Sequence, residues 1–310
     1  MFLYASNLVD IYRFQGEKNL IQAIEKKLTN EKYWLNRLQN RDVRFGYYEN
    51  CNNLLICVKE KKKLYVYTVT KVGYELDDTI SVLTGLDGDK KEEGDLKTPV
   101  GVYTLRNIIN NVEQFYGPFA FVTSYPNMYD RLNNKDGHGI WIHGLPLEGK
   151  RDNNNTKGCI VMKNDKLEKL KDEINYKKTY LLISEHNIFA ASKKDIASVL
   201  AFLYKWRKAW RECDFETYKS FYAENFKKSD GKGLKQFLDY KKRVFESKKH
   251  QKIKIFFTNI NIIPYQNIEN NKIFRIDMYE KYISPTYKYF GNKSLYVEFI
   301  NNKIKIIAEK

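Results

Sequence analysis

Between residues 52 and 186 the sequence alternates short apolar runs with turns rich in glycine and asparagine, and this alternation most limits the fold. The runs are rich in β-branched and aromatic residues, which favour strands. They cover residues 54–58, 64–69, 98–105, 119–122, 140–142, 159–162 and 179–183. Many short strands of this kind predict a mainly β sandwich or barrel, with one helix over residues 164–174.

The flanking segments follow other patterns. Residues 8–50 carry apolar side chains at helical spacing, which predicts a short N-terminal helical segment. Residues 188–310 begin with three amphipathic stretches (196–210, 215–226 and 234–245) and continue with four strand-like runs. Helices followed by an antiparallel sheet predict an α+β domain. The expected organisation is therefore a multi-domain α+β chain with units at 1–50, 51–187 and 188–310.

The formal net charge is +16, and residues 188–310 hold 26 Lys and Arg against 13 Asp and Glu. A basic unit attached to a nearly neutral one indicates an anionic partner, either nucleic acid, acidic glycan or anionic lipid. A solvated, lysine-rich surface explains the charge equally well. No run of eighteen apolar residues occurs, so we expect no transmembrane segment. The apolar residues 1–6 are too few for a signal peptide.

A histidine and a cysteine sixteen positions apart, each next to glycine, are the candidate reacting groups. His143-Gly144 ends one strand-like run, and Cys159 follows Gly158 at the start of another. If the strands are neighbours, the imidazole takes the thiol proton and the thiolate attacks a carbonyl. Backbone N–H groups around Lys157, Gly158 and Cys159 would stabilise the oxyanion, and a backbone carbonyl near Gly144 would orient the imidazole.

A buried strand cysteine and an ordinary turn histidine are the alternative, because free cysteines are among the most buried residues. The four cysteines show no CxxC spacing, and no set of His, Asp and Glu has the spacing of metal ligands. We therefore expect neither a disulfide framework, a metal nor another cofactor. No RNP, helix-turn-helix or finger motif supports nucleic acid as a partner.

Residues 52–186 resemble the L,D-transpeptidase catalytic domain, also called the YkuD domain. The pattern of that family is His-Gly, a gap, and Ser/Thr-x-Gly-Cys, which corresponds here to His143-Gly144 and Thr156-Lys157-Gly158-Cys159. Three further segments match, namely Thr98-Pro99-Val100-Gly101, Tyr125-Pro126-Asn127 and Gly137-His138-Gly139-Ile140. The resemblance implies a cysteine-dependent enzyme that acts on peptidoglycan.

The whole layout is similar to the cell-shape-determining L,D-carboxypeptidases of helical and curved bacteria, which have a C-terminal NTF2-like domain. The similarity implies a periplasmic enzyme, its signal peptide removed, with N-terminal helices that form a homodimer. Its substrates would be peptidoglycan muropeptides. Cys159 would attack the carbonyl of meso-diaminopimelate, and the terminal D-alanine would leave as a thioester forms on the cysteine. Hydrolysis then gives a tripeptide, whereas attack by an amine gives the cross-link of a transpeptidase. A noncatalytic binder of wall polymer remains the alternative from another class.

The expected site combines these patterns. Cys159, His143 and Gly144 are the predicted catalytic residues, and the predicted substrate-binding residues are His138, Trp141, Thr156, Lys157, Gly158, Arg131 and Lys135. Many members of the family have arginine two residues after the cysteine, where this chain has Val161. The substrate carboxylate is therefore expected to meet another cation, such as Lys157, Arg131 or Lys135.

Two features of the C-terminal unit have both a structural and a functional interpretation. Trp206 and Trp210 are one helical turn apart, which favours core packing over an aromatic ligand box. The run Lys241-Lys242-Arg243 is typical of a solvated face, and as a functional patch it would bind anionic wall polymer.

Overall fold

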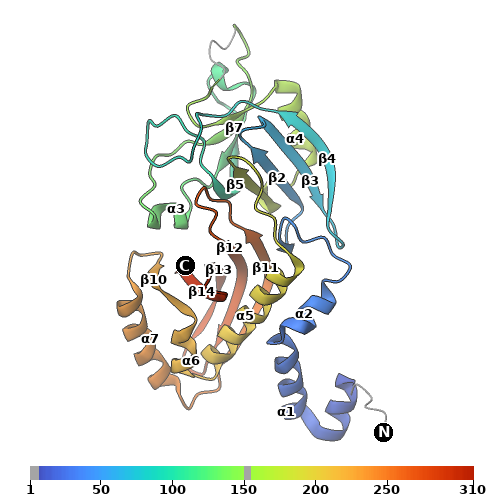
Figure 1. The fold of residues 1–310 in the computed structure, drawn as a ribbon, viewed down its shortest axis with the longest axis vertical. Helices are drawn as coiled ribbons and strands as arrows, with labels where there is room; N and C mark the ends of the chain where they lie inside the picture. Colours follow the sequence, from blue (N-terminus) through green and yellow to red (C-terminus); the bar gives the residue numbers. More distant parts are fainter. Residues whose placement is uncertain (1–6, 150–154) are drawn as a thin grey trace.

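The structure is a computed structural model that describes residues 7–149 and 155–310, so residues 1–6 discussed above lie outside it. Three units follow one another along the chain (Figure 1): two N-terminal helices, an eight-stranded sheet, and a six-stranded sheet with its own helices. This arrangement confirms the multi-domain α+β organisation with a mainly β central domain.

The N-terminal segment is helical only as far as residue 37. Helices α1 (Leu8–Leu28) and α2 (Glu31–Arg37) begin at asparagine caps, and Gly16, with a φ of 80°, kinks α1. Residues 38–50, expected to continue the helix, instead lead into strand β1 (Tyr47–Tyr48), which pairs with strand β11 (Lys254–Pro264) of the C-terminal domain. Gly46 permits this approach, because a Cβ there would collide with the carbonyl oxygen of Ile262.

The central domain is one mixed sheet in the order β4-β3-β2-β9-β5-β6-β7-β8. Its strands are β2 (Asn53–Val58), β3 (Lys63–Val69), β4 (Tyr74–Ser81), β5 (Gly101–Ile109), β6 (Ala120–Thr123), β7 (Trp141–His143), β8 (Ile160–Val161) and β9 (Thr179–Ser184). The chain leaving β4 bridges to β8 at Leu83 and Val161, so the two edges of the sheet meet there. The short helices are α3 (Met128–Leu132), α4 (Asn164–Glu173), η1 (Gln114–Tyr116) and η2 (Tyr176–Lys178). The helix predicted over 164–174 is thus confirmed.

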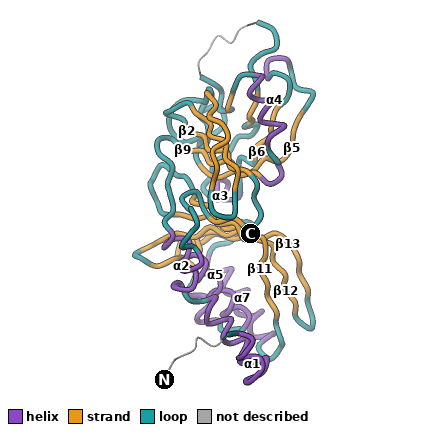
Figure 2. The backbone as a smooth tube through the Cα atoms, turned by 90° about the vertical axis from the view of Figure 1, so that its right-hand side faces the viewer, coloured by secondary structure: helices purple, strands orange, loops and turns teal. Residues whose placement is uncertain are grey.

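The C-terminal domain packs its helices on one side of a curved sheet (Figure 2). The elements are α5 (Lys193–Arg211), α6 (Phe215–Ser220), β10 (Tyr222–Lys228), α7 (Leu234–Lys248), β11 (Lys254–Pro264), β12 (Ile273–Ile283), β13 (Lys288–Ile300) and β14 (Lys303–Glu309). The helix predicted over 215–226 is wrong beyond Ser220. The chain there becomes β10, because it pairs in parallel with β14 from Tyr222 onward.

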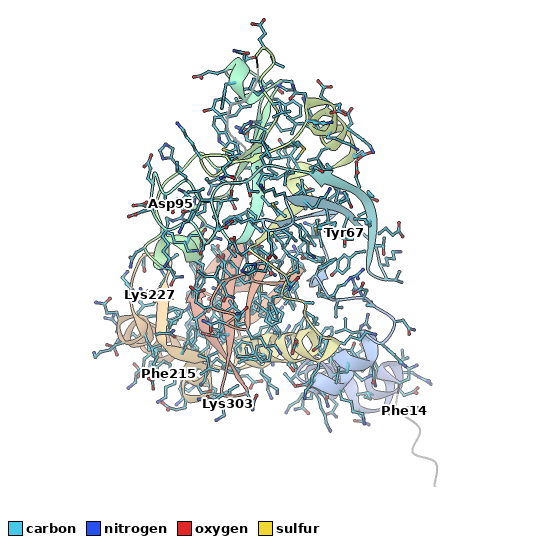
Figure 3. The ribbon with its side chains drawn as sticks, turned by 45° about the horizontal axis from the view of Figure 1, so that its top comes forward. Phe14, Tyr67, Asp95, Phe215, Lys227 and Lys303 are labelled. Atoms are coloured by element: carbon cyan, nitrogen blue, oxygen red, sulfur yellow. The ribbon has the colours of Figure 1, made fainter. Side chains whose placement is uncertain are left out.

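The N-terminal helices dock on α5 of this domain. The Trp34 ring of α2 stacks on Tyr204 with centroids 5.6 Å apart. Glu25 of α1 accepts from Arg207 at 2.5 Å and from Arg211 at 2.7 Å. Phe14, on the first part of α1, lies at the far end of the molecule from the central domain (Figure 3) and is 75% exposed.

The central and C-terminal domains share a hydrophobic core. One cluster of buried side chains contains Leu54 and Leu182 from the central sheet together with Ile263 and Tyr296 from the C-terminal sheet. The Tyr129 ring of α3 stacks on Tyr296 with centroids 4.7 Å apart. Hydrogen bonds also cross the boundary, from Arg275 to the Val102 carbonyl at 3.0 Å and from Tyr180 to Asp277 at 2.8 Å. A shared core of this kind couples the stabilities of the two domains.

We therefore expect Tyr296→Ala to destabilise both domains together. Tyr296 is 1% exposed, and truncating a buried aromatic ring costs about 3–5 kcal/mol of unfolding free energy. Urea unfolding followed by circular dichroism should show one transition displaced to lower urea. The control Tyr240→Ala, at a tyrosine that is 56% exposed, should change the free energy by less than about 0.5 kcal/mol. A second transition that Tyr296→Ala leaves in place would contradict the shared core.

Candidate active site

Strands β7 and β8 bring the histidine and the cysteine to one face of the sheet. The two strands pair in parallel, with Ile142 opposite Ile160 and His143 opposite Val161. Ile142 and Ile160 are fully buried in the core of the central domain. Because side chains alternate along a strand, His143 and Cys159 both face the opposite side of the sheet. The alternation also places Trp141, a predicted substrate-binding residue, on that face.

The thiol of Cys159 lies against the backbone of the strand that carries the histidine. Its Sγ accepts a hydrogen bond from the Trp141 N–H at 3.4 Å and is 3.4 Å from the Gly139 carbonyl oxygen. Cys159 is partly exposed, in contrast to Cys57, which is fully buried. The sulfur is therefore accessible from solvent and is held in a fixed direction.

The imidazole of His143 is 2% exposed and is oriented by the next residue in the chain. Its Nδ1 lies 2.8 Å from the carbonyl oxygen of Gly144, so the structure has a backbone carbonyl in the predicted place. A carbonyl can only accept a hydrogen bond, so Nδ1 carries the proton and the lone pair of the neutral ring is on Nε2. An imidazole in this tautomer can act as a base through Nε2.

The turn before the nucleophile is built by Thr156 and Gly158. The Thr156 hydroxyl donates to the Cys159 carbonyl at 2.6 Å and accepts from the Gly158 N–H at 3.0 Å. Gly158 has a φ of +121°, and a Cβ there would lie 2.8 Å from the Lys97 carbonyl oxygen. Thr156 and Gly158, both predicted to bind substrate, are buried and shape this turn. The Gly158 N–H, one of the expected oxyanion donors, is bonded to the Thr156 hydroxyl. Lys157 between them is exposed.

Tyr116 completes the wall of the site. Its ring centroid lies 5.0 Å from that of His143 and 5.2 Å from that of Trp141. Burial, and then the negative charge of a Cys159 thiolate, raise the pKa of the Tyr116 hydroxyl. Its backbone carbonyl accepts from the Gly144 N–H at 3.0 Å. The sequence Tyr116-Gly117-Pro118 indicates a turn or a lid here, but it does not indicate that the Tyr116 ring meets the imidazole.

The other predicted substrate-binding residues are engaged elsewhere or exposed. Lys135 forms an ion pair with Asp89 and lies 3.6 Å from Asp130, which is completely buried. The Arg131 guanidinium donates to the Pro126 carbonyl. His138 has an exposed side chain 3.8 Å from Glu93. Since Lys135 and Arg131 already have partners, Lys157 is the exposed cation that the structure places on the turn of the nucleophile.

Buried ion pairs hold the long loop between β4 and β5 beside this turn. Lys59 pairs with Glu185 at 2.5 Å and also donates to the Gly88 carbonyl. Within the loop, Lys90 pairs with Asp95 at 2.7 Å, and Asp95 is labelled in Figure 3. Hydrogen bonds from Lys90 and from three backbone N–H groups lower the Asp95 pKa to about 2, although its burial opposes this. The loop thus presents the Lys97 carbonyl against Gly158 in a defined position.

A second group of buried charges lies inside the C-terminal domain. Lys293 pairs with Glu309 at 3.0 Å, and its ammonium lies 5.5 Å from the Trp210 ring centroid. Lys241, expected on a solvated face, packs over Trp210 at 4.7 Å, and burial lowers its pKa to about 8. Lys241 points inward because it lies four residues from both Phe237 and Phe245 on the buried face of α7. Trp206 and Trp210 are core residues, and their rings pack against the ammonium groups of Lys241 and Lys293.

Two negative observations concern the described residues. Within residues 7–149 and 155–310, no group of three or more His, Cys, Asp or Glu side chains is placed to hold a metal ion. Among the helices of the same ranges, none combines the length and apolar character that a membrane span needs.

Comparison with known families agrees with this geometry. The family model of the L,D-transpeptidase catalytic domain matches residues 53–183, and that of the Cds6 C-terminal NTF2-like domain matches residues 198–310. The fold and the site therefore define a cysteine enzyme of the peptidoglycan-processing L,D-transpeptidase class, with an NTF2-like domain attached.

Solved structures place the chain more narrowly. The helical cell shape determining protein Pgp2 from Campylobacter jejuni is 41% identical, with a TM-score of 0.85, over 91% of this chain and 99% of that one. Bd1075 from Bdellovibrio bacteriovorus is 28% identical, with a TM-score of 0.68, over 87% and 96% of the two chains. The chain belongs to the family of Pgp2. No curated protein sequence matches it.

The cysteine environments predict selective alkylation. Burial raises the pKa of Cys51 and of Cys57 to about 12 and also raises that of Cys213. Cys159 is partly exposed on the face of the imidazole, a base that can accept the thiol proton. We expect brief treatment with iodoacetamide at pH 7 to modify Cys159 first, as measured by peptide mass spectrometry. Equal labelling of Cys213 would contradict an activated thiol at Cys159.

Proposed function

We propose that the chain is a peptidoglycan L,D-carboxypeptidase that removes the terminal D-alanine from tetrapeptide stems. The observation that supports this most directly is the partly exposed Cys159 on the same face as an imidazole whose Nδ1 is held by the Gly144 carbonyl. The family match adds the substrate class, because L,D-transpeptidase domains act on peptidoglycan. The bond cleaved would join meso-diaminopimelate to D-alanine.

The geometry supports a two-step acyl transfer. His143 Nε2 takes the proton from the Cys159 thiol, and the thiolate attacks the carbonyl carbon of meso-diaminopimelate. The tetrahedral intermediate collapses as the imidazolium returns its proton to the leaving nitrogen, which releases D-alanine and leaves a thioester. Water then attacks the thioester, with His143 again as the base. The products are the tripeptide and the free thiol.

Lys157 is the proposed contact for the carboxylate of the departing D-alanine. It is exposed on the turn two residues before the nucleophile, whereas Val161, at the common arginine position, is fully buried. Tyr116 and Trp141 would form the walls that position the stem peptide. His138 is a more distant candidate, because it lies on an exposed turn.

Hydrolysis is preferred here over cross-linking because of the domain layout, which matches that of the Pgp2 family along nearly the whole chain. Pgp2 is named as a determinant of helical cell shape, and we infer that this chain also acts on cell shape. Such an enzyme would work in the periplasm, where peptidoglycan is accessible. A transpeptidase would use an amine in place of water in the second step.

We expect Cys159→Ala to abolish D-alanine release from purified tetrapeptide muropeptides, because no thioester can form. His143→Gln should lower the rate by about 10²–10⁴-fold, the usual contribution of a general base. Mass spectrometry of the digests should show tripeptides with the wild type, and Cys213→Ala should serve as the active control. Full activity of Cys159→Ala would refute the proposal, and new dimeric muropeptides would establish the transpeptidase instead.

We also propose that two chains associate through the N-terminal helices, the homodimer that the family resemblance implies. Helix α1 has four large apolar side chains exposed, namely Val9, Tyr12, Phe14 and Ile21. Exposed apolar groups gathered on one helix are typical of an association surface.

The double variant Tyr12→Ser/Phe14→Ser should therefore shift the protein from dimer to monomer without loss of the fold. Light scattering coupled to size-exclusion chromatography measures the mass directly. Tyr240→Ser, which removes an equally exposed ring from α7, is the matched control and should leave the mass unchanged. A wild-type protein that is monomeric at all concentrations would contradict the proposed dimer.

A further inference from the structure

A buried polar atom beside the site has no assigned role in the chemistry above. Asn164, the first residue of α4, has its side-chain oxygen Oδ1 buried without a hydrogen-bond donor. A buried carbonyl oxygen without a donor costs free energy, so its presence calls for a physical reason.

Two glycines leave the space that this oxygen occupies. A Cβ on Gly117 would lie 2.8 Å from Asn164 Oδ1, and a Cβ on Gly144 would overlap the same atom even more closely. The oxygen is therefore packed against the Cα atoms of both glycines, where Cα–H groups are weak donors. Gly117 has a φ of +77°, a conformation that favours glycine in any case, whereas at Gly144 close packing is the reason for a glycine.

Gly144 is also the residue that orients the imidazole. Its carbonyl accepts from His143 Nδ1 at 2.8 Å, and its N–H donates to the Tyr116 carbonyl at 3.0 Å. The position of the Gly144 backbone therefore sets the direction of the imidazole and also joins it to the segment that carries the Tyr116 ring. Asn164 is the side chain in contact with that backbone.

Asn164 belongs to the segment that carries the nucleophile. It follows Cys159 by five residues, and between them the Met162 N–H donates to the His143 carbonyl at 3.1 Å. One side chain thus connects the cysteine segment, the histidine strand and the Tyr116 turn. Two titratable side chains on the imidazole face are Tyr116, from η1, and Cys159, before β8.

We propose that Asn164 is a positioning residue for the thiol–imidazole pair, because its Oδ1 fills the space beside Gly144 and Gly117 and so holds the Gly144 carbonyl against His143 Nδ1. The inference rests on the proposed function only in taking Cys159 and His143 as the reacting groups. It predicts that loss of this contact uncouples the imidazole from the thiol.

The first test measures the rate of iodoacetamide alkylation of Cys159 as a function of pH, with the modified peptide identified by mass spectrometry. His143→Gln defines the profile of an uncoupled thiol, with a midpoint near the ordinary pKa of about 8.5. Asn164→Ala should move the profile toward that limit and slow alkylation at pH 6–7 by about 10–100-fold, since small displacements at a reacting pair have effects of this size. Asn111→Ala, at an exposed asparagine of the same domain, is the control and should match the wild type. A wild-type profile for a folded Asn164→Ala protein would overturn the proposal.

The second test uses the predicted collision. Gly144→Ala should reduce alkylation at pH 6–7 to the His143→Gln level, because the new Cβ collides with Asn164 Oδ1. Adding Asn164→Gly removes the obstacle. The double variant should be alkylated at least about tenfold faster than Gly144→Ala, a coupling expected only of residues in contact. If Gly144→Ala does not fold, the double variant should restore folding. A double variant no better than Gly144→Ala, in rate or in folding, would overturn the proposal.

Alkylation requires no muropeptide, so the two proposals can fail separately. An imidazole-dependent profile that responds to Asn164 in a protein without carboxypeptidase activity would refute the proposed function and keep this inference. Muropeptide hydrolysis that is unchanged in Asn164→Ala would refute this inference and keep the proposed function.

Discussion

The hydrogen bond between His143 Nδ1 and the Gly144 carbonyl is the interaction on which the proposed chemistry depends. It fixes the tautomer of a nearly buried imidazole and leaves the Nε2 lone pair for the thiol. A neutral carbonyl in this role avoids the cost of burying a carboxylate. The Gly144 carbonyl cannot reorient as a side chain does, so its direction depends on how firmly the backbone is held. The Gly144 N–H bond to Tyr116 and the close packing around Gly144 supply that support.

The thiol is held by the same kind of backbone-centred construction. The parallel register of β7 and β8 decides which residues share the face of the imidazole, and the apolar partners Ile142 and Ile160 fix that register through the core. Thr156 then closes the turn before Cys159 with two hydrogen bonds. A slip of one residue in either strand would turn one reacting group toward the hydrophobic core and its apolar neighbour toward the site, so the site and the core impose the same alignment.

Local patterns were enough to predict much of this arrangement. The apolar run at residues 140–142 predicted the strand β7, and the pattern at residues 164–174 predicted α4, because both features depend only on residues that are near in sequence. Contacts between segments that are distant in sequence could not be predicted from these local patterns. Lys135 meets Asp89 across 46 positions, which removed an expected substrate cation. The strand β10 exists because Tyr222 meets Ile306 of β14, and Tyr116 reaches His143 only through the folded sheet.

The packing of Val161 has a consequence for specificity. Val161 is fully buried, with His143 opposite on one side and Leu83 bridged on the other. A guanidinium at this position would therefore need a route to solvent that the neighbouring strands close. In the proposed mechanism the counter-charge for the substrate carboxylate comes from outside β8, and the exposed Lys157 offers a point charge on a flexible stem. Such a cation attracts a carboxylate without the bidentate geometry of arginine. Selection of the terminal residue would then depend on the shape of the walls made by Tyr116 and Trp141 more than on the ion pair.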